Sequence, residues 1–272
     1  SGGWIGTILR INLTTGQIAK EPLNMDWAKE FLGGRGLGAK YLYEEMDPTI
    51  DPLSPENKMN FVTGPMTGTN ASTSSRFTVV TKGALTNAIT TSNSGGTWGP
   101  ELKFAGYDML ILEGRAARPS YIWIYNDEVE IRSAEHLWGK TTWETDDIIR
   151  EEGGVHDTVV SCIGPAGEKL VRFSAIVNDR HRAAGRSGVG AVMGSKNLKA
   201  IAVRGTGAVP VSDPKSFMAS MWTMKDKLVE HPVTGEGLAA YGTAVLVNII
   251  NESGALPTNN HQMSQLEGAD NI

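Results

Sequence analysis

Two stretches of the sequence share one layout: Met59-Asn60-Phe61-Val62-Thr63-Gly64-Pro65 and, 100 positions later, Val159-Val160-Ser161-Cys162-Ile163-Gly164-Pro165. Short runs rich in apolar and β-branched residues that end in Gly and Pro are typical of a β-strand followed by a turn. Each stretch follows a predicted β-hairpin and a predicted helix. Each is followed by a strand, a glycine-rich loop and a final strand. This repeated order predicts an internal duplication.

Equivalent positions of the two copies are not evenly spaced. The predicted hairpins start at Thr7 and Tyr121, 114 positions apart, whereas the final strands end at Gly114 and Gly205, 91 positions apart. Insertions and deletions therefore separate the copies. Any mixed α+β chain can be aligned loosely in this way, but the repeated Gly-Pro pair and the repeated glycine-rich loop favour duplication.

The repeats predict one α+β domain over residues 4–208, with copies at about 4–114 and 121–205. Two such copies would most simply pair about a pseudo-two-fold axis. Beyond this domain the pattern becomes helical, beginning with Asp213-Pro214 as an N-cap and a proline in the first helical position. We expect residues 209–272 to be the start of an α-helical second domain, and the polar end of the chain to be a truncation.

Three local expectations concern the segments between these elements. Residues 92–99 are expected to form a glycine-rich loop. Residues 170–176 are expected to form a strand because apolar residues recur there. Residues 179–194 are expected to form a second glycine-rich loop that carries arginines.

The composition is that of a globular protein: 40% of the 272 residues are hydrophobic and 20% are charged. The net charge is −5 and there is no basic run, so nothing favours a nucleic-acid partner. The single cysteine, Cys162, excludes an intrachain disulfide and is expected to be a buried core residue. No apolar run approaches the length of a membrane span and no signal peptide is recognised, so a cytoplasmic protein is expected.

Glycine-rich segments are the candidates for a binding site. The chain has 32 glycines, above the average share of about 7%, and glycine lets a backbone approach a ligand closely. The first segment, 64–76, ends at Arg76, and the second, 92–96, contains Asn93 and Gly95. Taken alone, the first is better explained as a polar surface loop, and the second is a weak signal.

A third segment, 178–190, is a stronger candidate. It carries Arg180, Arg182 and Arg186 among glycines in an acidic chain. Such a cluster repels itself unless an anion or carboxylates neutralise it, which favours an anion site. His181, between two of these arginines, is either a base or a donor to the backbone or to the edge of a ligand.

The duplication relates the second and third segments. Asn93 and Ala183 are 90 positions apart, close to the 91 that separate the final strands. Two related loops that face each other would bind a ligand with two similar anionic halves. Nucleotide motifs give no competing explanation, since Gly-x-x-x-x-Gly-Lys-Ser/Thr is absent and Gly188-x-Gly190-x-x-x-Gly194 has the wrong spacing for a dinucleotide fingerprint.

Long motifs in these segments resemble the tungsten-containing aldehyde:ferredoxin oxidoreductase family. They include Gly64-Pro65-x-Thr67-Gly68-Thr69, Asn93-Ser94-Gly95-Gly96, Asn178-Asp179-x-His181-Arg182-Ala183-Ala184-Gly185-Arg186 and Gly188-Val189-Gly190-Ala191-Val192-Met193-Gly194-Ser195-Lys196. A further similar run at 241–248 extends the resemblance into the predicted second domain. The resemblance therefore covers nearly the whole chain.

The resemblance implies a two-sheet base that holds a tungsten bis-pterin cofactor, whose phosphates are bridged by magnesium. It implies cofactor contacts from Arg76, Asn93, Gly95, Arg182, Ala183, Gly185 and Arg186. The backbone carbonyls of Asn93 and Ala183 would reach the magnesium ion, and no catalytic side chain is assigned in this chain. The cysteines of the family's 4Fe-4S cluster are absent, so the chain by itself is expected to be inactive.

By the same resemblance, the parent enzyme would oxidise an aldehyde to a carboxylic acid and pass electrons through the cluster to ferredoxin or a ferredoxin-like subunit. It would form a homo-oligomer or join the remaining part of the enzyme. Two alternatives stay open: the reduction of an aromatic acyl thioester within the same family, and a non-catalytic module that binds or assembles the pterin cofactor. The sequence leaves tungsten versus molybdenum, and the aldehyde, undecided.

Overall fold

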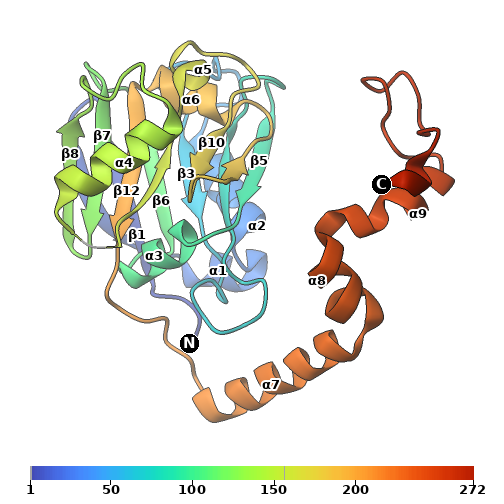
Figure 1. Cartoon of the computed structure of the whole chain (residues 1–272). Helices are drawn as coiled ribbons and strands as arrows, with labels where there is room; N and C mark the ends of the chain where they lie inside the picture. Colours follow the sequence, from blue (N-terminus) through green and yellow to red (C-terminus); the bar gives the residue numbers. More distant parts are fainter. Residues whose placement is uncertain (1, 156) are drawn as a thin grey trace. The chain divides into compact units, whose positions relative to one another are not determined.

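A computed structural model of the chain describes residues 2–155 and 157–272 (Figure 1). The chain divides into two compact units. The first unit, up to Ser212, contains all the β-strands of two sheets, and the second, from Asp213, is helical.

Two six-stranded mixed sheets form the first unit. The strands of the first sheet lie in the order β2 (Gln17–Pro22), β1 (Thr7–Asn12), β6 (Met109–Glu113), β3 (Met59–Val62), β4 (Phe77–Lys82) and β5 (Ile89–Ser94). Those of the second sheet lie in the order β8 (Glu128–Ser133), β7 (Ser120–Tyr125), β12 (Leu198–Arg204), β9 (Val159–Cys162), β10 (Ile176–Asn178) and β11 (Arg182–Ala184).

Both sheets follow the same plan. From the hairpin edge, each contains the two hairpin strands, then the last strand of the copy, and then three successive strands. In each, the first hairpin strand runs parallel to the last strand, as β1 does to β6 and β7 to β12. All other neighbours are antiparallel. The predicted duplicated, two-sheet α+β fold followed by helices is confirmed.

The main core lies between the two sheets. Side chains of β3 alternate between its two faces, so Phe61 joins this core while Val62 joins a cluster beneath α2. Trp98 is fully buried in the core, and its Nε1 donates to the carbonyl oxygen of Ile201 at 3.0 Å. A further layer lies outside the second sheet, where Ile149 of α4 packs on its outer face.

The helices of the first unit follow from the strand order. The first copy contains α1 (Met25–Phe31) and α2 (Gly34–Glu45), which precede β3, and α3 (Trp98–Phe104), which follows β5. Of these, α2 covers the outer face of the first sheet. The second copy contains α4 (Thr142–Gly153), α5 (Pro165–Glu168) and α6 (Val189–Ser195). The predicted capping box at the start of α4 is present, with Thr141 and Glu144 bonding each other's backbone.

Lys196 and Cys162 are among the buried titratable groups of this unit. The Nζ of Lys196 donates to the carbonyl oxygens of Gly114, at 3.0 Å, and of Asn57. Burial, assisted by a nearby arginine, lowers the pKa of Lys196 to about 8. Cys162 is a free, buried thiol whose pKa burial raises to about 12, so it is the core residue that was predicted rather than a nucleophile.

The three local expectations are wrong in part. Residues 92–94 belong to β5, because they pair with β4, and Ser92 and Ser94 are buried although they are polar. Residues 170–176 do not form a strand: Leu170 turns with φ +58, and only Ile176 enters β10. The expected loop at 179–194 contains β11 and all of α6 except its last residue, Ser195.

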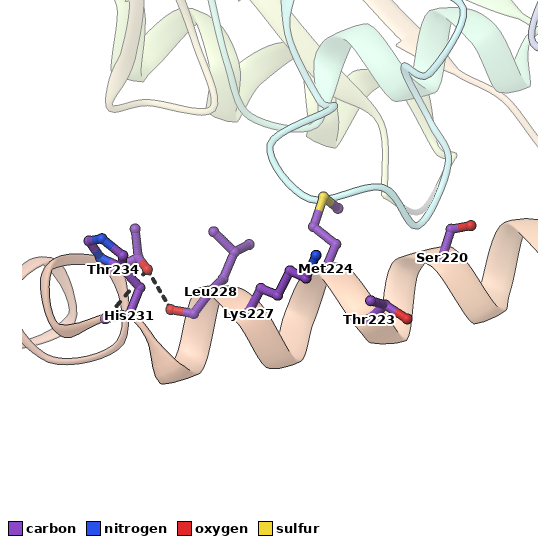
Figure 2. A pocket seen from close by; sticks show the side chains of 7 residues that line it. All are labelled: Ser220, Thr223, Met224, Lys227, Leu228, His231 and Thr234. Carbon is purple, nitrogen blue, oxygen red and sulfur yellow. Dashed lines mark hydrogen bonds between the residues drawn. The ribbon is translucent and has the colours of Figure 1, made fainter.

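The second unit begins with α7 (Pro214–Glu230), whose N-cap Asp213 accepts a hydrogen bond from the backbone of Ser216 at 3.0 Å. Shorter helical segments follow: Pro232–Gly237, α8 (Leu238–Tyr241), Gly242–Leu246, α9 (Val247–Glu252) and Ala269–Asn271. A depression of about 590 Å³ runs along α7 (Figure 2), lined by Ser220, Thr223, Met224, Lys227, Leu228, His231 and Thr234. No side chain of α7 is buried.

One stretch of this unit corrects the expectation that no apolar run approaches membrane length. Within the described residues, Pro232–Glu252 alone is long and apolar enough to cross a membrane, with 21 residues and a mean hydropathy of 1.3 over an 18-residue window. None of it is buried. Core helices of soluble proteins meet the same criterion, so the stretch is weak evidence for a span. It is also interrupted at Gly242, where φ is +58.

Candidate functional site

A polar pocket of about 370 Å³ lies where β5 of the first sheet meets β11 of the second. Figure 1 shows β5 beside the hairpin that begins with β10. The pocket is lined by Thr73, Ser75, Arg76, Asn93, Ser94, Gly95, Gly96, His181, Arg182 and Ala183. These come from the three segments that the sequence singled out. Five of the seven predicted site residues therefore share one pocket: Arg76, Asn93, Gly95, Arg182 and Ala183.

The other two predicted residues lie just past the end of β11, outside the pocket lining. The backbone nitrogen of Arg186 donates to Ser92 Oγ on β5 at 2.9 Å. A Cβ on Gly185 would meet no atom within 4 Å, so its backbone is open. Gly185 and Arg186 thus follow the same junction of β5 and β11 without entering the pocket.

The first sheet positions Asn93 and Arg76. Asn93 is opposite Thr78 in the antiparallel ladder, and Thr78 Oγ1 donates to Asn93 Oδ1 at 2.7 Å. Thr67 Oγ1 donates to the carbonyl oxygen of Arg76 at 3.1 Å and accepts from the nitrogen of Gly64 at 3.0 Å. The loop between β3 and β4 is therefore fastened at both ends, and the Arg76 side chain starts from a fixed backbone.

The second sheet presents His181 on a tight hairpin. Asp179 and Arg180, with φ of +47 and +59, both adopt the left-handed conformation that non-glycine residues seldom adopt. The nitrogen of His181 donates to the carbonyl oxygen of Asp179 at 2.6 Å. Its ring meets Trp143 edge-on, with centroids 5.4 Å apart, which holds the imidazole at the pocket.

Arg180 departs from the expected cluster of three arginines. It pairs with Asp146 of α4, with 3.2 Å between Nε and Oδ2, and also with Asp147. Asp146 is nearly buried and also binds Arg150 at 3.0 Å. The expectation that Arg180 contributes to an anion site is wrong, because carboxylates of α4 already neutralise it.

Arg76, Arg182 and Arg186 differ from Arg180 in this respect. Among the described residues, none of these three exposed side chains makes a hydrogen bond or an ion pair. No Asp or Glu lines the pocket, although the chain has a net charge of −5. Of the three, Arg76 and Arg182 line the pocket, and their free guanidinium groups are suited to bind phosphate oxygens.

Side chains offer little to a metal ion. Within the part of the chain that is described, no three His, Cys, Asp or Glu residues come close enough together to hold one. The lining instead includes the hydroxyl and amide side chains of Thr73, Ser75, Asn93 and Ser94, and oxygen is the kind of donor that magnesium accepts together with phosphate. Thr73 lies within the predicted segment 64–76 but was not itself predicted to line the site; the available signal was the run of hydroxyl residues before Arg76.

Comparisons with known proteins identify relatives of this chain. The N-terminal domain family of aldehyde ferredoxin oxidoreductase matches residues 8–205, and the family of its domains 2 and 3 matches residues 221–272. The chain is 56% identical to the tungsten-containing aldehyde ferredoxin oxidoreductase of Pyrococcus furiosus, over 96% of this chain and 43% of that protein. It is 54% identical to the protein of the same description from Pyrococcus abyssi, over 98% of this chain and 44% of that protein.

A solved structure is similar as well. The active-site complex BamBC of benzoyl coenzyme A reductase, in complex with 1,5-dienoyl-CoA, superposes with a TM-score of 0.82 at 39% identity, over 84% of this chain and 35% of that one. The chain spans less than half the length of the curated relatives that it matches. The two family matches and the identities together show that the chain belongs to the aldehyde ferredoxin oxidoreductase family.

Proposed function

We propose that the first unit holds the tungsten bis-pterin cofactor of an aldehyde-oxidising enzyme. The observation that carries this proposal is the pocket at the junction of β5 and β11, where residues 93–96 and 181–183 meet beside free guanidinium groups. These two segments come from equivalent places in the duplicated sheets. A cofactor with two phosphate-bearing halves matches a site built from two related halves.

The arginines would bind the phosphates of the cofactor. Arg76 and Arg182 face the pocket and can each make two parallel hydrogen bonds to a phosphate group. Arg186, beyond the pocket, would serve the second half of the cofactor. Gly95 and Gly185 would allow close approach, since the nearest atom to a Cβ on Gly95 is 4.0 Å away and a Cβ on Gly185 meets none.

Magnesium would join the two halves of the site. We propose that the backbone carbonyls of Asn93 and Ala183 contact the ion, and that phosphate oxygens complete its shell. Hard oxygen ligands of this kind are those that magnesium prefers. The absence of an acidic cluster in the described residues is compatible with this, because the phosphates supply the negative charge.

When bound, the cofactor supplies the two-electron redox chemistry, and the residues of this chain bind and orient it. The whole protein would oxidise an aldehyde to a carboxylic acid and pass electrons through a 4Fe-4S cluster to ferredoxin or a ferredoxin-like subunit. The one cysteine of this chain is buried, so the cluster ligands would belong to other parts of a longer protein. We expect the 272-residue chain alone not to turn over.

The proposal extends to the setting of the protein. We propose a cytoplasmic enzyme in which the apolar stretch at 232–252 packs against protein, with a further copy or the remaining part of the enzyme as its partner. To test this, the chain would be expressed in a host cell and the lysate separated into soluble and membrane fractions. We expect the chain in the soluble fraction, and salt and carbonate washes of the membranes should release any chain found there.

A second candidate function is the reduction of an aromatic acyl thioester. The structural match to benzoyl coenzyme A reductase favours it, whereas the 56% identity to an aldehyde oxidoreductase favours the first. Assays of the longer gene product with an aldehyde and with an aromatic coenzyme A thioester discriminate between the two. A non-catalytic assembly module would bind pterin and turn over neither substrate.

Elemental and pterin analysis of the purified chain tests the cofactor proposal. After growth with tungstate, the chain should contain tungsten and pterin in a bis-pterin ratio, and Arg182→Ala should lose both. Arg118→Ala removes an arginine that is 79% exposed and outside the pocket, and it should retain both. A wild-type chain without metal or pterin, or an Arg182→Ala variant as fully loaded as Arg118→Ala, would contradict the proposal.

A further inference from the structure

A buried amide connects the two sheets behind the pocket. Asn178 is the last residue of β10 and is 1% exposed. Its Oδ1 accepts from Ser94 Oγ, at the end of β5, at 2.6 Å, and its Nδ2 donates to the carbonyl oxygen of Gly95 at 2.8 Å. Both partners line the pocket, whereas Asn178 does not. One side chain from the second sheet thus fixes two lining residues of the first.

Asp179 extends this connection to the start of α3. The Nδ2 of Asn178 also donates to Asp179 Oδ2 at 2.6 Å. The same carboxylate accepts from the backbone nitrogen of Thr97 at 3.0 Å and from the Thr97 hydroxyl. Between them, Gly96 has φ +90, and a Cβ there would lie 2.3 Å from Asp179 Oδ2. A side chain at Gly96 would therefore displace the Asp179 carboxylate, and the positive φ also favours glycine here.

The network joins the two halves of the site through neighbouring residues. On the first sheet its contacts follow directly after Asn93, and on the second sheet only Arg180 separates them from His181 and Arg182. The turn between them contains the two left-handed residues Asp179 and Arg180. Such strain persists only where the surrounding structure holds it. Loss of the network would therefore let the hairpin relax and change the separation of Arg182 from Asn93.

We propose that Asn178 and Asp179 are positioning residues that fix the separation of the two halves of the cofactor site. This inference rests on the proposed function, because it concerns a ligand that touches both halves at once. The two residues act through the carbonyl of Gly95 and through the hairpin that carries Arg182, without touching the cofactor. A ligand that bridges two loops binds tightly when the loops are already at the required distance, since binding then has no ordering cost to offset.

The test measures how long the chain holds its cofactor. On chain purified with cofactor, pterin fluorescence after dilution gives the dissociation rate, and melting temperatures with and without cofactor give the stabilisation on binding. For Asn178→Ala we expect dissociation about tenfold faster, which corresponds to about 1.4 kcal/mol. We also expect a smaller rise in melting temperature on loading.

Asn60→Ala is the matched control. Asn60 is likewise 1% exposed, and its Nδ2 donates to a backbone carbonyl, that of Gly38, at 3.2 Å, but it lies in β3 and not at the pocket. A purely structural loss lowers the melting temperatures of the loaded and unloaded forms alike. Asn60→Ala should therefore leave the dissociation rate and the rise on loading unchanged.

Thr97→Val keeps the inference testable if Asn178→Ala does not fold. Thr97 is exposed, and this substitution removes only the hydroxyl contact with Asp179, so we expect a folded variant with a smaller acceleration of dissociation. A wild-type dissociation rate in the folded variants overturns the positioning role and leaves the proposed function intact. A wild-type chain that holds neither tungsten nor pterin overturns both.

Discussion

Replacing Gly96 by alanine measures how tightly the two sheets are held together at the pocket. A Cβ on Gly96 would lie 2.3 Å from Asp179 Oδ2, 2.8 Å from Asp179 Cγ and 3.0 Å from Asn178 Nδ2. Non-bonded carbon atoms do not approach oxygen so closely, so the carboxylate must move. Gly139 is a matched position, because its φ of +87 is close to the +90 of Gly96 and a Cβ there would meet nothing within 4 Å.

Two costs add at Gly96 and only one applies at Gly139. Alanine in the left-handed region costs about 1–2 kcal/mol at either position. Moving the Asp179 carboxylate also breaks its hydrogen bond from the backbone of Thr97, and a bond to a charged group contributes about 1.5–3 kcal/mol. Gly96→Ala should therefore lower the free energy of unfolding by about 2.5–5 kcal/mol, and Gly139→Ala by about 1–2 kcal/mol.

Urea unfolding of the whole chain, followed by tryptophan fluorescence, gives both values. The comparison requires equal denaturant slopes for the two variants, since the slope reports the surface exposed on unfolding. The difference of about 1.5–3 kcal/mol between them is the contribution of the contact between the sheets. Equal losses in Gly96→Ala and Gly139→Ala would refute the reasoning, because the Asp179 contact would then add nothing to stability.

Three further predictions concern the first unit. Trp98→Ala should lower the free energy of unfolding by about 3–5 kcal/mol, because a fully buried indole and its hydrogen bond are lost, whereas Trp222→Ala at a 56% exposed position should change it little in the same titration. The free energy of unfolding should rise with pH between about 8 and 10.5, because the buried Lys196 loses its proton near pH 8 while the unfolded chain keeps it to about 10.5. In a pH series of unfolding curves, Lys196→Met should flatten this rise. An unchanged slope in the variant would assign the rise to other groups. Thr141→Ala should cost about 1 kcal/mol through loss of the α4 cap, as measured by thermal unfolding, and no change would show that Glu144 alone satisfies the helix start.

The duplicated fold could be predicted because its signals are local and occur twice. Strand, Gly-Pro and hairpin patterns identify their elements without reference to the rest of the chain. β5 was missed because Ile89–Ser94 is mostly polar, and its buried serines have partners only through β4 and the second sheet. Burial that depends on distant segments leaves no pattern in the strand itself.

The site shows the same limit. The segments that contain Arg76, Asn93 and Arg182 stand out by their glycines, arginines and resemblance, and the structure brings them together. The different fate of Arg180 depends on carboxylates of α4, more than thirty positions away in sequence. The role of Asn178 likewise depends on where β5 ends. Pairings between distant elements decide which charges remain free, and a single sequence does not show these pairings.

The apolar layer between the sheets has a consequence for binding. The pocket joins two segments of the first sheet to one segment of the second, so their separation depends on how far apart the sheets pack. That thickness is set by side chains such as Phe61 and Trp98, whose ring centroids are 5.4 Å apart. A cavity in this layer would let one sheet shift against the other as a body, and the displacement would reach Asn93 and Ala183 without any change to the pocket residues. Under the proposed function, core packing and ligand affinity in this unit are therefore coupled through the separation of the two sheets.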